Sequence, residues 1–136
     1  MTKKLWIPAV LFLAGCGAGA ESVDHLKDLN QSMMDLRIYQ ENLGDHIKSK
    51  KLDDASWLLE GMDSIMLLLA DRFPEHRRLD TSFAYYYKRE MQEPVRGIRQ
   101  AIRDKDTARA LRHYRVLVDN CNDCHIDNEV EKEVWF

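Results

Sequence analysis

Residues 121–125 of this chain read CNDCH, and the stretch ends eleven residues before the C-terminal Phe136. Two cysteines three positions apart, with a histidine directly after the second, form the C-x-x-C-H pattern of covalent c-type haem attachment. Positions i, i+3 and i+4 share one face of an α-helix. On a helix, Cys121 and Cys124 can therefore each form a thioether with a haem vinyl group while His125 directs its imidazole at the iron.

A redox dithiol and a zinc site both fit the sequence around the two cysteines less well. A redox dithiol is expected at the strand-to-helix junction of a βαβ unit, and no such pattern surrounds Cys121 and Cys124. A structural zinc site needs a second pair of ligands, and the one remaining cysteine, Cys16, lies in the N-terminal signal described below. A chance match is the third alternative. We interpret the motif as the attachment point of one covalently bound haem c per chain.

The sequence after residue 21 is patterned for helices throughout. Apolar residues recur at steps of three and four, and no segment keeps the alternation of a strand. Four helices are predicted, at about 22–49, from after Asp53 or Asp54 to residue 73, at about 80–103, and from an N-cap at Asp106 through the motif. The fold class indicated is all-α, a four-helix bundle whose C-terminal helix carries the haem.

Each predicted helix has one apolar stripe that is expected to face the bundle interior. The inward-facing positions are Leu26, Leu29, Met33, Leu36, Leu43 and Ile47 in the first helix, Ala55, Leu58, Met62, Ile65 and Leu69 in the second (widened by Leu59, Met66 and Leu68), Phe83, Tyr87, Met91, Val95, Ile98 and Ile102 in the third, and Leu111, Tyr114, Val118, Cys121 and His125 in the fourth. Gln40 interrupts the first stripe, and Pro94 must kink or restart the third helix. The aromatic run at 83–87 is either core with amphipathic surface or the lining of a haem edge.

The N-terminus has the pattern of an export signal rather than of a folded segment. A positive start is followed by an apolar run, residues 5–14, that is too short to span a membrane as a mature helix. The run leads into the sequence LAGC at 13–16, which resembles the lipobox of bacterial lipoproteins. That resemblance implies cleavage before Cys16 and a diacylglycerol on its thiol. The alternative is an ordinary secretory signal cut near Ala18 or Ala20.

These features divide the chain into a signal peptide at 1–15, a lipidated tether at 16–21 and a single bundle domain at 22–136. Lipid together with N-terminal acylation is enough for stable anchoring, and Gly17 after the cysteine resembles the outer-membrane sorting signal of enteric bacteria. We therefore expect a periplasmic protein anchored by lipid to the outer membrane. Loss of the two lysines of the signal changes the formal charge of −3 to −5, which argues against nucleic-acid binding and mildly favours basic partners.

A helical bundle with the haem motif near its C-terminus resembles the class II c-type cytochromes, the cytochrome c′ family. Class I cytochromes c carry the motif near the N-terminus, and strong identity to the class II family is confined to the motif here. The resemblance implies an antiparallel bundle with haem c inside it and His125 as the fifth iron ligand. Low-spin electron carriers of the family place a methionine from the first helix at the sixth position, whereas high-spin members leave it open and bind small gases.

Met33 is the residue that this resemblance places at the sixth position. Met33 and Met34 are adjacent, so their side chains point about 100° apart on a helix and only one can face the core. The steps of the first apolar stripe select Met33. A thioether ligand raises the reduction potential of the iron relative to bis-histidine ligation. An open site and histidine ligation are the alternatives.

Among the other histidines, only His25, one residue off the first stripe, is placed to compete for the iron. His46 and His76 lie among charged residues, and His113 is twelve residues before the motif histidine, too far along a helix to reach the same iron. Four positions after the motif histidine the resembled family commonly has a basic residue, and this chain has Glu129. A carboxylate close to the imidazole would strengthen it as a donor and lower the potential.

The function expected is one-electron transfer with periplasmic redox partner proteins, by a monohaem cytochrome that reaches the membrane through its lipid anchor. The alternative is a five-coordinate cytochrome c′-like protein that binds or senses NO or CO. The pattern places no distal His–Arg pair of the kind a haem peroxidase uses, so no enzymatic activity is expected. Homodimers that pair through the first two helices occur in the resembled family, although no clear apolar patch for one is visible in the sequence.

Overall fold

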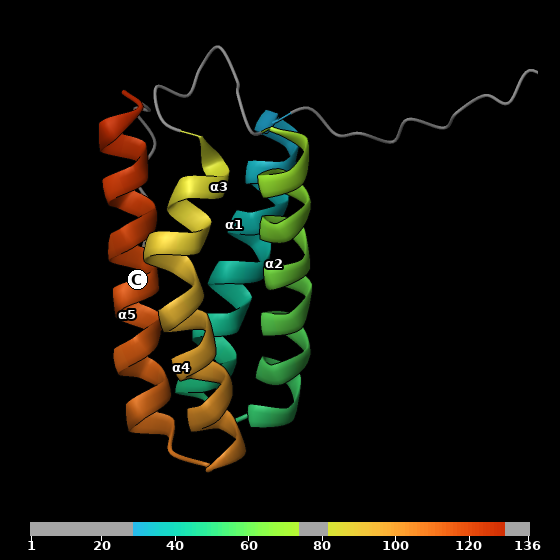
Figure 1. The fold of residues 1–136 in the computed structure, drawn as a ribbon. Helices are drawn as coiled ribbons and strands as arrows, with labels where there is room; N and C mark the ends of the chain where they lie inside the picture. The colour runs from blue at the N-terminus through green and yellow to red at the C-terminus, as the bar shows by residue number, and fades with distance from the viewer. Residues whose placement is uncertain (1–28, 74–81, 130–136) are drawn as a thin grey trace, which may run out of the picture.

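The computed structural model describes residues 29–73 and 82–129, and all regular structure within them is helical. The elements are α1 (Leu29–Lys48), α2 (Leu52–Arg72), α3 (Phe83–Tyr86), η1 (Tyr87–Met91), α4 (Gln92–Arg103) and α5 (Thr107–Asp127). Because α3, η1 and α4 follow one another without a break, they form one rod, and four rods lie side by side with neighbours antiparallel (Figure 1). The predicted all-α class is confirmed.

Two short turns at the same end of the molecule set the antiparallel pairing. Residues 49–51 join α1 to α2, and residues 104–106 join α4 to α5, so each pair of helices packs along its whole length. Lys50 and Lys105 adopt left-handed backbone conformations in these turns, with φ of 58° and 55°. We call this end, with the two turns, the closed end of the bundle.

The start predicted for α2 is wrong by two to three residues. The helix begins at Leu52, with Lys51 as its N-cap residue, so Asp53 and Asp54 lie in its first turn instead of capping it. Carboxylates in the first turn interact favourably with the helix dipole, and this is the reason for an acidic pair there. The end of α2 is as predicted, because Arg72 is its last residue and a proline follows at position 74.

The caps of the other two rods follow the sequence signals. Asp106 caps α5 as predicted, since its carboxylate accepts a hydrogen bond from the Arg109 N–H at 2.9 Å. Ser82 caps α3 by accepting from the Tyr85 N–H at 3.3 Å. The described part of the third rod therefore begins at Phe83, two to three residues after the predicted start.

The core is a single cluster to which every rod contributes, and most predicted stripe positions belong to it. All six positions predicted for the third rod are buried: Phe83, Tyr87, Met91, Val95, Ile98 and Ile102. In α2 the prediction was less accurate. Leu59 is fully buried while Leu58 is only partly buried, and Leu68 is 53% exposed, so its inward assignment is wrong. The cause is that α2 turns the Leu59–Met66 face toward the bundle centre and leaves the Leu68 face to solvent.

Gln40, which interrupted the predicted stripe of α1, is buried against α5. Its backbone carbonyl accepts a hydrogen bond from the Tyr114 hydroxyl at 2.9 Å, and its side-chain amide donates back to the same hydroxyl. Both residues are at most 4% exposed. One turn further along, Gly44 lets the Tyr114 ring lie against the backbone of α1, because a Cβ at that position would sit 2.5 Å from the hydroxyl. This contact fixes the register between α1 and α5.

Pro94 changes the third rod in a way that the sequence predicted only in part. The rod is not broken, but the turn before the proline widens into the π-helix η1, in which the Gln92 N–H donates to the Tyr87 carbonyl five residues back. Proline has no N–H, so the Glu90 carbonyl four residues earlier loses its ordinary helical donor. The Asn120 side chain of α5 donates to that carbonyl instead.

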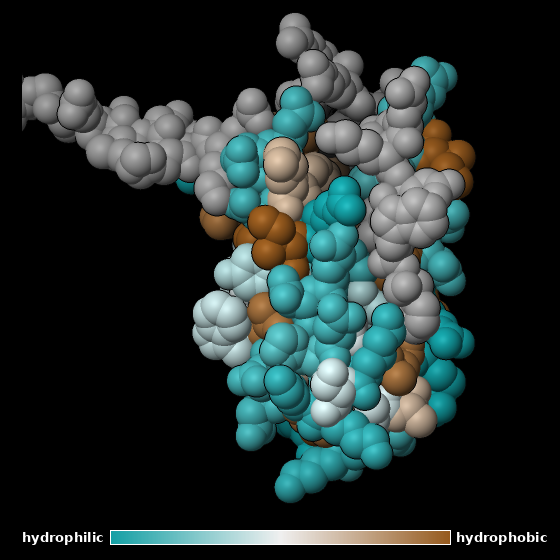
Figure 2. All heavy atoms as spheres, turned by 180° about the vertical axis from the view of Figure 1, so that it is seen from behind, coloured by the Kyte–Doolittle hydropathy of each residue, from teal (hydrophilic) through white to brown (hydrophobic). Residues whose placement is uncertain are grey.

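Several predicted features lie outside the described residues: the signal peptide 1–15, Cys16 and the tether 16–21, the helical start with His25 and Leu26, and the connection that contains His76. Among the described helices, none combines the length and apolarity that crossing a bilayer requires. The face seen in Figure 2, turned by 180° from Figure 1, is largely hydrophilic and interrupted by separate apolar side chains. Its helices include α1, where Ile38 is 57% exposed.

Candidate cofactor-attachment site

The three motif residues occupy the last two turns of α5, at the end of the bundle opposite the two short turns (Figure 1). Cys124 is buried in the core cluster, and Cys121 is partly buried and packs against it. His125 is also partly buried. The predicted helical placement of the motif is therefore confirmed, and its face continues the buried stripe of Tyr114, Leu117 and Val118.

The helix ends immediately after the motif. Asn128 is the C-cap residue, and its side-chain amide donates to the Cys124 carbonyl at 2.8 Å and lies 3.6 Å from the Cys124 sulfur. Glu129 follows in a left-handed conformation, with φ of 53°, and is exposed. Glu129 thus lies beyond the helix end, where its carboxylate is solvated, and a strong effect on the imidazole is not expected from it.

The two thiols are held in their neutral form. Burial raises the pKa of Cys121 to about 12, and the neighbouring Cys124 contributes to the rise. Burial also raises the pKa of Cys124 to about 11, against the opposing effect of the Asn128 hydrogen bond. A redox dithiol needs the reverse, a thiol pKa lowered to about 3.5–7.5 so that a thiolate is available. This environment argues against thiol–disulfide exchange and fits buried cysteines that form stable thioethers.

The register of α1 against α5 brings Met33 to the level of the motif. Gln40 and Tyr114 contact each other, and the two helices run antiparallel. Met33 lies seven residues before Gln40 and Cys121 lies seven residues after Tyr114. Both displacements are about 10 Å along the bundle and in the same direction. Met33 and the motif therefore occupy the same layer of the bundle.

The two adjacent methionines of α1 face in different directions, as the stripe predicted. Met33 is partly buried and packs against the core, whereas Met34 is 55% exposed. Of the two thioethers, only that of Met33 faces the interior that α5 also faces. Ligation by Met33 stays a prediction.

The described histidines other than His125 lie elsewhere. His113 packs against Gly97 of α4, where a Cβ would collide with its ring. The His46 Nδ1 lies 2.8 Å from the Asn42 carbonyl of its own helix, and its Nε2 lies 3.8 Å from Asp54, which places this residue close to the closed end. Neither reaches the layer of the motif.

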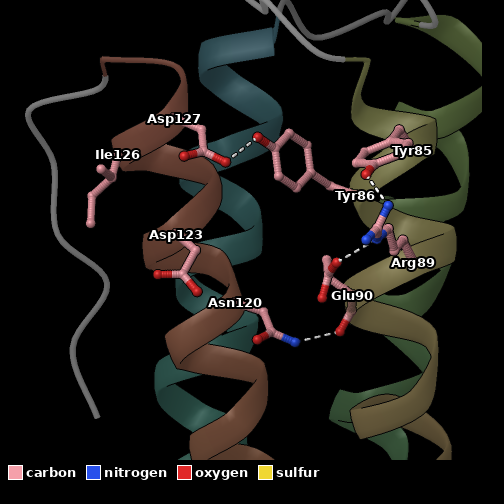
Figure 3. A pocket seen from close by; sticks show the side chains of 8 residues that line it. All are labelled: Tyr85, Tyr86, Arg89, Glu90, Asn120, Asp123, Ile126 and Asp127. Atoms are coloured by element: carbon pink, nitrogen blue, oxygen red, sulfur yellow. Dashed lines mark hydrogen bonds and ion pairs between the residues drawn. The ribbon is translucent and has the colours of Figure 1, made fainter.

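A groove runs between the third rod and α5 beside the motif (Figure 3). It has a volume of about 660 Å³ and is lined by Tyr85, Tyr86, Arg89, Glu90, Asn120, Asp123, Ile126 and Asp127. Three of these side chains are carboxylates and one is a guanidinium, whereas cofactor sites are mostly apolar. The lining of this groove is therefore more polar than that of a typical cofactor site.

Two interactions beside the motif were not predicted from the sequence. Tyr86 donates to the Asp127 carboxylate at 2.7 Å, and Asn120 donates to the Glu90 carbonyl. For the second there was a signal, because Pro94 frees the carbonyl four residues before it and so demands a donor from outside the helix. For the first there was none, since a tyrosine in an aromatic run can face several ways.

Comparison of the chain with protein-family models, with curated proteins and with solved structures finds no match. In the part of the chain that the structure describes, no three histidine, cysteine, aspartate or glutamate side chains gather into a metal-binding group.

Proposed function

We propose that the protein is a monohaem c-type cytochrome that transfers single electrons, with haem c attached through Cys121 and Cys124 and with His125 and Met33 as iron ligands. The observation that carries the proposal is the motif itself, placed on the inward face of the last helix in the layer that also holds the inward methionine of α1. The class of protein proposed is the one that the sequence resembles, the class II c-type cytochromes. Bound haem would supply the Fe(II)/Fe(III) couple.

The chain's own residues support each part of this role. The raised pKa values of Cys121 and Cys124 argue against a redox role for the two thiols and leave covalent attachment as the favoured role. His125 sits on the same helical face, one residue after the second cysteine, which is the position that the motif assigns to the iron ligand. The surrounding apolar cluster excludes water and so limits reorganisation during electron transfer.

Met33 is proposed as the sixth ligand because it enters the same layer from the opposite wall. A thioether is a soft, flexible ligand that favours the reduced iron and raises its potential. The second candidate function, a gas-binding or gas-sensing protein with an open sixth position, differs only in whether Met33 binds. The partly buried position of Met33 against the core favours ligation.

We further propose that the protein acts in the periplasm as a lipoprotein. The LAGC sequence at 13–16 supplies the acceptor Cys16, and residues 17–21 are the tether between lipid and bundle. Exchange of electrons with periplasmic proteins needs no chemistry on a substrate, so no enzymatic activity is proposed.

The deciding experiment is expression of the full chain together with a cytochrome c maturation system, followed by mass measurement and absorption spectroscopy. We expect a covalent adduct of about 616 Da, the mass of one haem, and a low-spin spectrum with a weak sulfur-to-iron band in the oxidised form. High-spin bands with ready uptake of CO would favour the gas-binding function. A polypeptide without the adduct would contradict both.

A further inference from the structure

Two hydrogen bonds from the third rod bracket the motif on α5 (Figure 3). Asn120, immediately before the first motif cysteine, donates to the Glu90 carbonyl. Asp127, two residues after the motif histidine, accepts from the Tyr86 hydroxyl at 2.7 Å. The five motif residues lie between these two attachment points, and two of them, Cys121 and Cys124, pack into or against the core on the adjoining face.

The spacing of the two bonds gives them control over the rotation of α5. Asn120 and Asp127 are seven residues apart, which is nearly two full turns, so their side chains leave the helix on the same side. Two bonds on one side, about 10 Å apart along the axis, resist both sliding of the helix and its rotation about that axis. A single bond would act as a pivot about which the end of the helix could still tilt.

On the third rod, each of the two hydrogen bonds is made by a group that is held firmly in place. The Glu90 carbonyl is part of a helix backbone and is available because Pro94 cannot donate to it. The ring of Tyr86 is 6% exposed and belongs to the core cluster, so only its hydroxyl reaches the groove. Neither attachment point is a mobile surface side chain.

We propose that Asn120 and Tyr86 are positioning residues, which set the rotation of the last two turns of α5 and thereby the direction in which the two thiols and the imidazole of the motif face. This inference rests on the proposed function for its meaning, because orientation of the imidazole matters once the iron is bound. Asn120 and Tyr86 act through the helix, and neither is one of the proposed attachment points or iron ligands.

The test compares two neighbouring tyrosines that line the same groove. Tyr86→Phe removes the bond that crosses to α5, while Tyr85→Phe removes a hydroxyl that accepts from Arg89 within the third rod only. Asn120→Leu removes the second crossing bond at nearly constant size. All are made in the full matured chain.

The first readout is hydrogen exchange of the backbone amides of residues 121–127. We expect exchange about tenfold faster in Tyr86→Phe and in Asn120→Leu, as for the loss of one hydrogen bond that holds a helix end. Tyr85→Phe is expected to match the parent chain. The second readout is the electron paramagnetic resonance g values and the midpoint potential, which report the orientation of the axial ligands and would shift in the same two variants.

Equal exchange rates and g values in all three variants and the parent would overturn the proposal. A change in exchange rate or g values in Tyr85→Phe as large as that in Tyr86→Phe would also overturn it. The orientation of α5 would then depend on the groove as a whole and not on the two crossing hydrogen bonds. Hydrogen exchange needs no cofactor, so a chain that carries no haem would contradict the proposed function while the exchange comparison still decides the positioning role.

Discussion

The core of the bundle has different side chains at its two ends. Beside aliphatic residues such as Leu29, Leu69, Leu117 and Val118, the motif end contains sulfur and aromatic side chains: Met33, Met62, Met66, Tyr86, Tyr87, Cys121 and Cys124. The closed end contains mostly small and branched aliphatic side chains: Leu43, Ile47, Ala55, Ile98, Ala101, Ile102 and Ala110. The Gln40–Tyr114 contact lies between them.

The difference in side chains suggests a division of roles: the closed end mainly stabilises the fold, and the motif end carries the proposed site. Branched aliphatic residues pack in few conformations and specify one structure, whereas methionine adapts to the shape of its neighbours. The closed end also has the two tight turns, while the motif end has the π-helical turn, a feature that is frequent at functional sites. The motif therefore lies where the packing is most able to accommodate a large group.

The largest effect is expected from removing the attachment points. Cys121→Ala combined with Cys124→Ala should abolish covalently bound haem completely, because no other described cysteine is available to form a thioether. Haem staining after denaturing electrophoresis and mass measurement check this. Retention of the adduct in the double variant would show that the attachment lies elsewhere.

Cys16→Ser provides the matched control among the cysteines. It should leave the haem in place and release the protein from the membrane fraction, since the lipid would be lost but the bundle untouched. A haem deficit in this variant would contradict the separate roles proposed for the three cysteines.

Met33→Ala should convert the low-spin iron to a high-spin form that binds CO, because the sixth position would open. Met34→Ala, at the adjacent and 55% exposed position, should leave the spectrum unchanged. Absorption spectra of the oxidised and reduced forms make the comparison. Identical spectra in both variants would remove Met33 as a ligand. High-spin spectra would then favour the gas-binding function, and low-spin spectra would favour a different sixth ligand.

At the boundary between the two ends, Gly44→Ala should destabilise the protein by about 2 kcal/mol, as for overpacking a rigid core. The added Cβ would lie 2.5 Å from the Tyr114 hydroxyl, which is buried and hydrogen-bonded to both the backbone and the side chain of Gln40. Urea denaturation measures the loss.

Gly61→Ala is the control for the Gly44→Ala substitution. There the added Cβ meets the ring of Tyr39, which is only partly buried and stacks loosely on Trp57 at 6.1 Å between ring centroids. This ring can turn away, and alanine is favoured over glycine in a helix by about 1 kcal/mol. A change near zero or a gain is expected, and a loss equal to that of Gly44→Ala would show that Tyr39 is as rigid as Tyr114.

A smaller effect of pH is expected where α2 meets α4. Arg99 donates to Glu60 at 2.6 Å and to Asp63 at 2.9 Å, and the hydrogen bond to Arg99 lowers the pKa of Glu60 below its ordinary value. A lowered folded-state pKa adds stability that is present above the ordinary glutamate pKa and is lost as the pH falls through the folded value. Glu60 is exposed, so the contribution is below about 1 kcal/mol.

Glu60→Gln should therefore reduce stability at pH 7 slightly and flatten its decline between about pH 5 and pH 3. Urea denaturation across that range provides the measurement. Glu93→Gln, whose partner Arg96 is on the same exposed helix face, serves as the control. An unchanged slope for Glu60→Gln would show that the pair to Arg99 adds nothing to folding.

A similarly small effect is expected at the closed end itself. Lys105→Gly should stabilise the protein by about 0.5–1 kcal/mol, because glycine adopts the left-handed conformation without the steric cost that lysine bears. Arg112→Gly, on the exposed side of α5, should instead destabilise by about 1 kcal/mol. Urea denaturation distinguishes the two, and a loss in Lys105→Gly would mean that the lysine side chain contributes to the turn.

The sequence predicted the helices and the inward faces because both depend on local periodicity. The stripe Phe83–Ile102 and the direction of Met33 were correct, since a single turn of helix decides which side of it is apolar. Leu68 was assigned wrongly because α2 has apolar residues on more than half of its circumference, and only the packing of α1 and α4 on it decides which are covered.

The motif of the candidate site could be predicted from the sequence, but the contacts around the motif could not. The spacing of Cys121, Cys124 and His125 is a local pattern, but the Gln40–Tyr114 contact joins residues 74 positions apart. No periodicity in either helix indicates how far one slides along the other. The layer that Met33 shares with the motif could be inferred only after that contact was known.

The π-helical turn affects which side of the third rod faces the bundle interior before and after it. Phe83, Tyr87, Met91 and Val95 follow one another at intervals of four, and each interval overshoots a complete helical revolution by about 40°. Three intervals would carry Phe83 about 120° away from Val95, out of contact with the same neighbours. The wider turn winds more slowly and reduces this drift, so the residues before and after it on one continuous helix remain buried in a single interior.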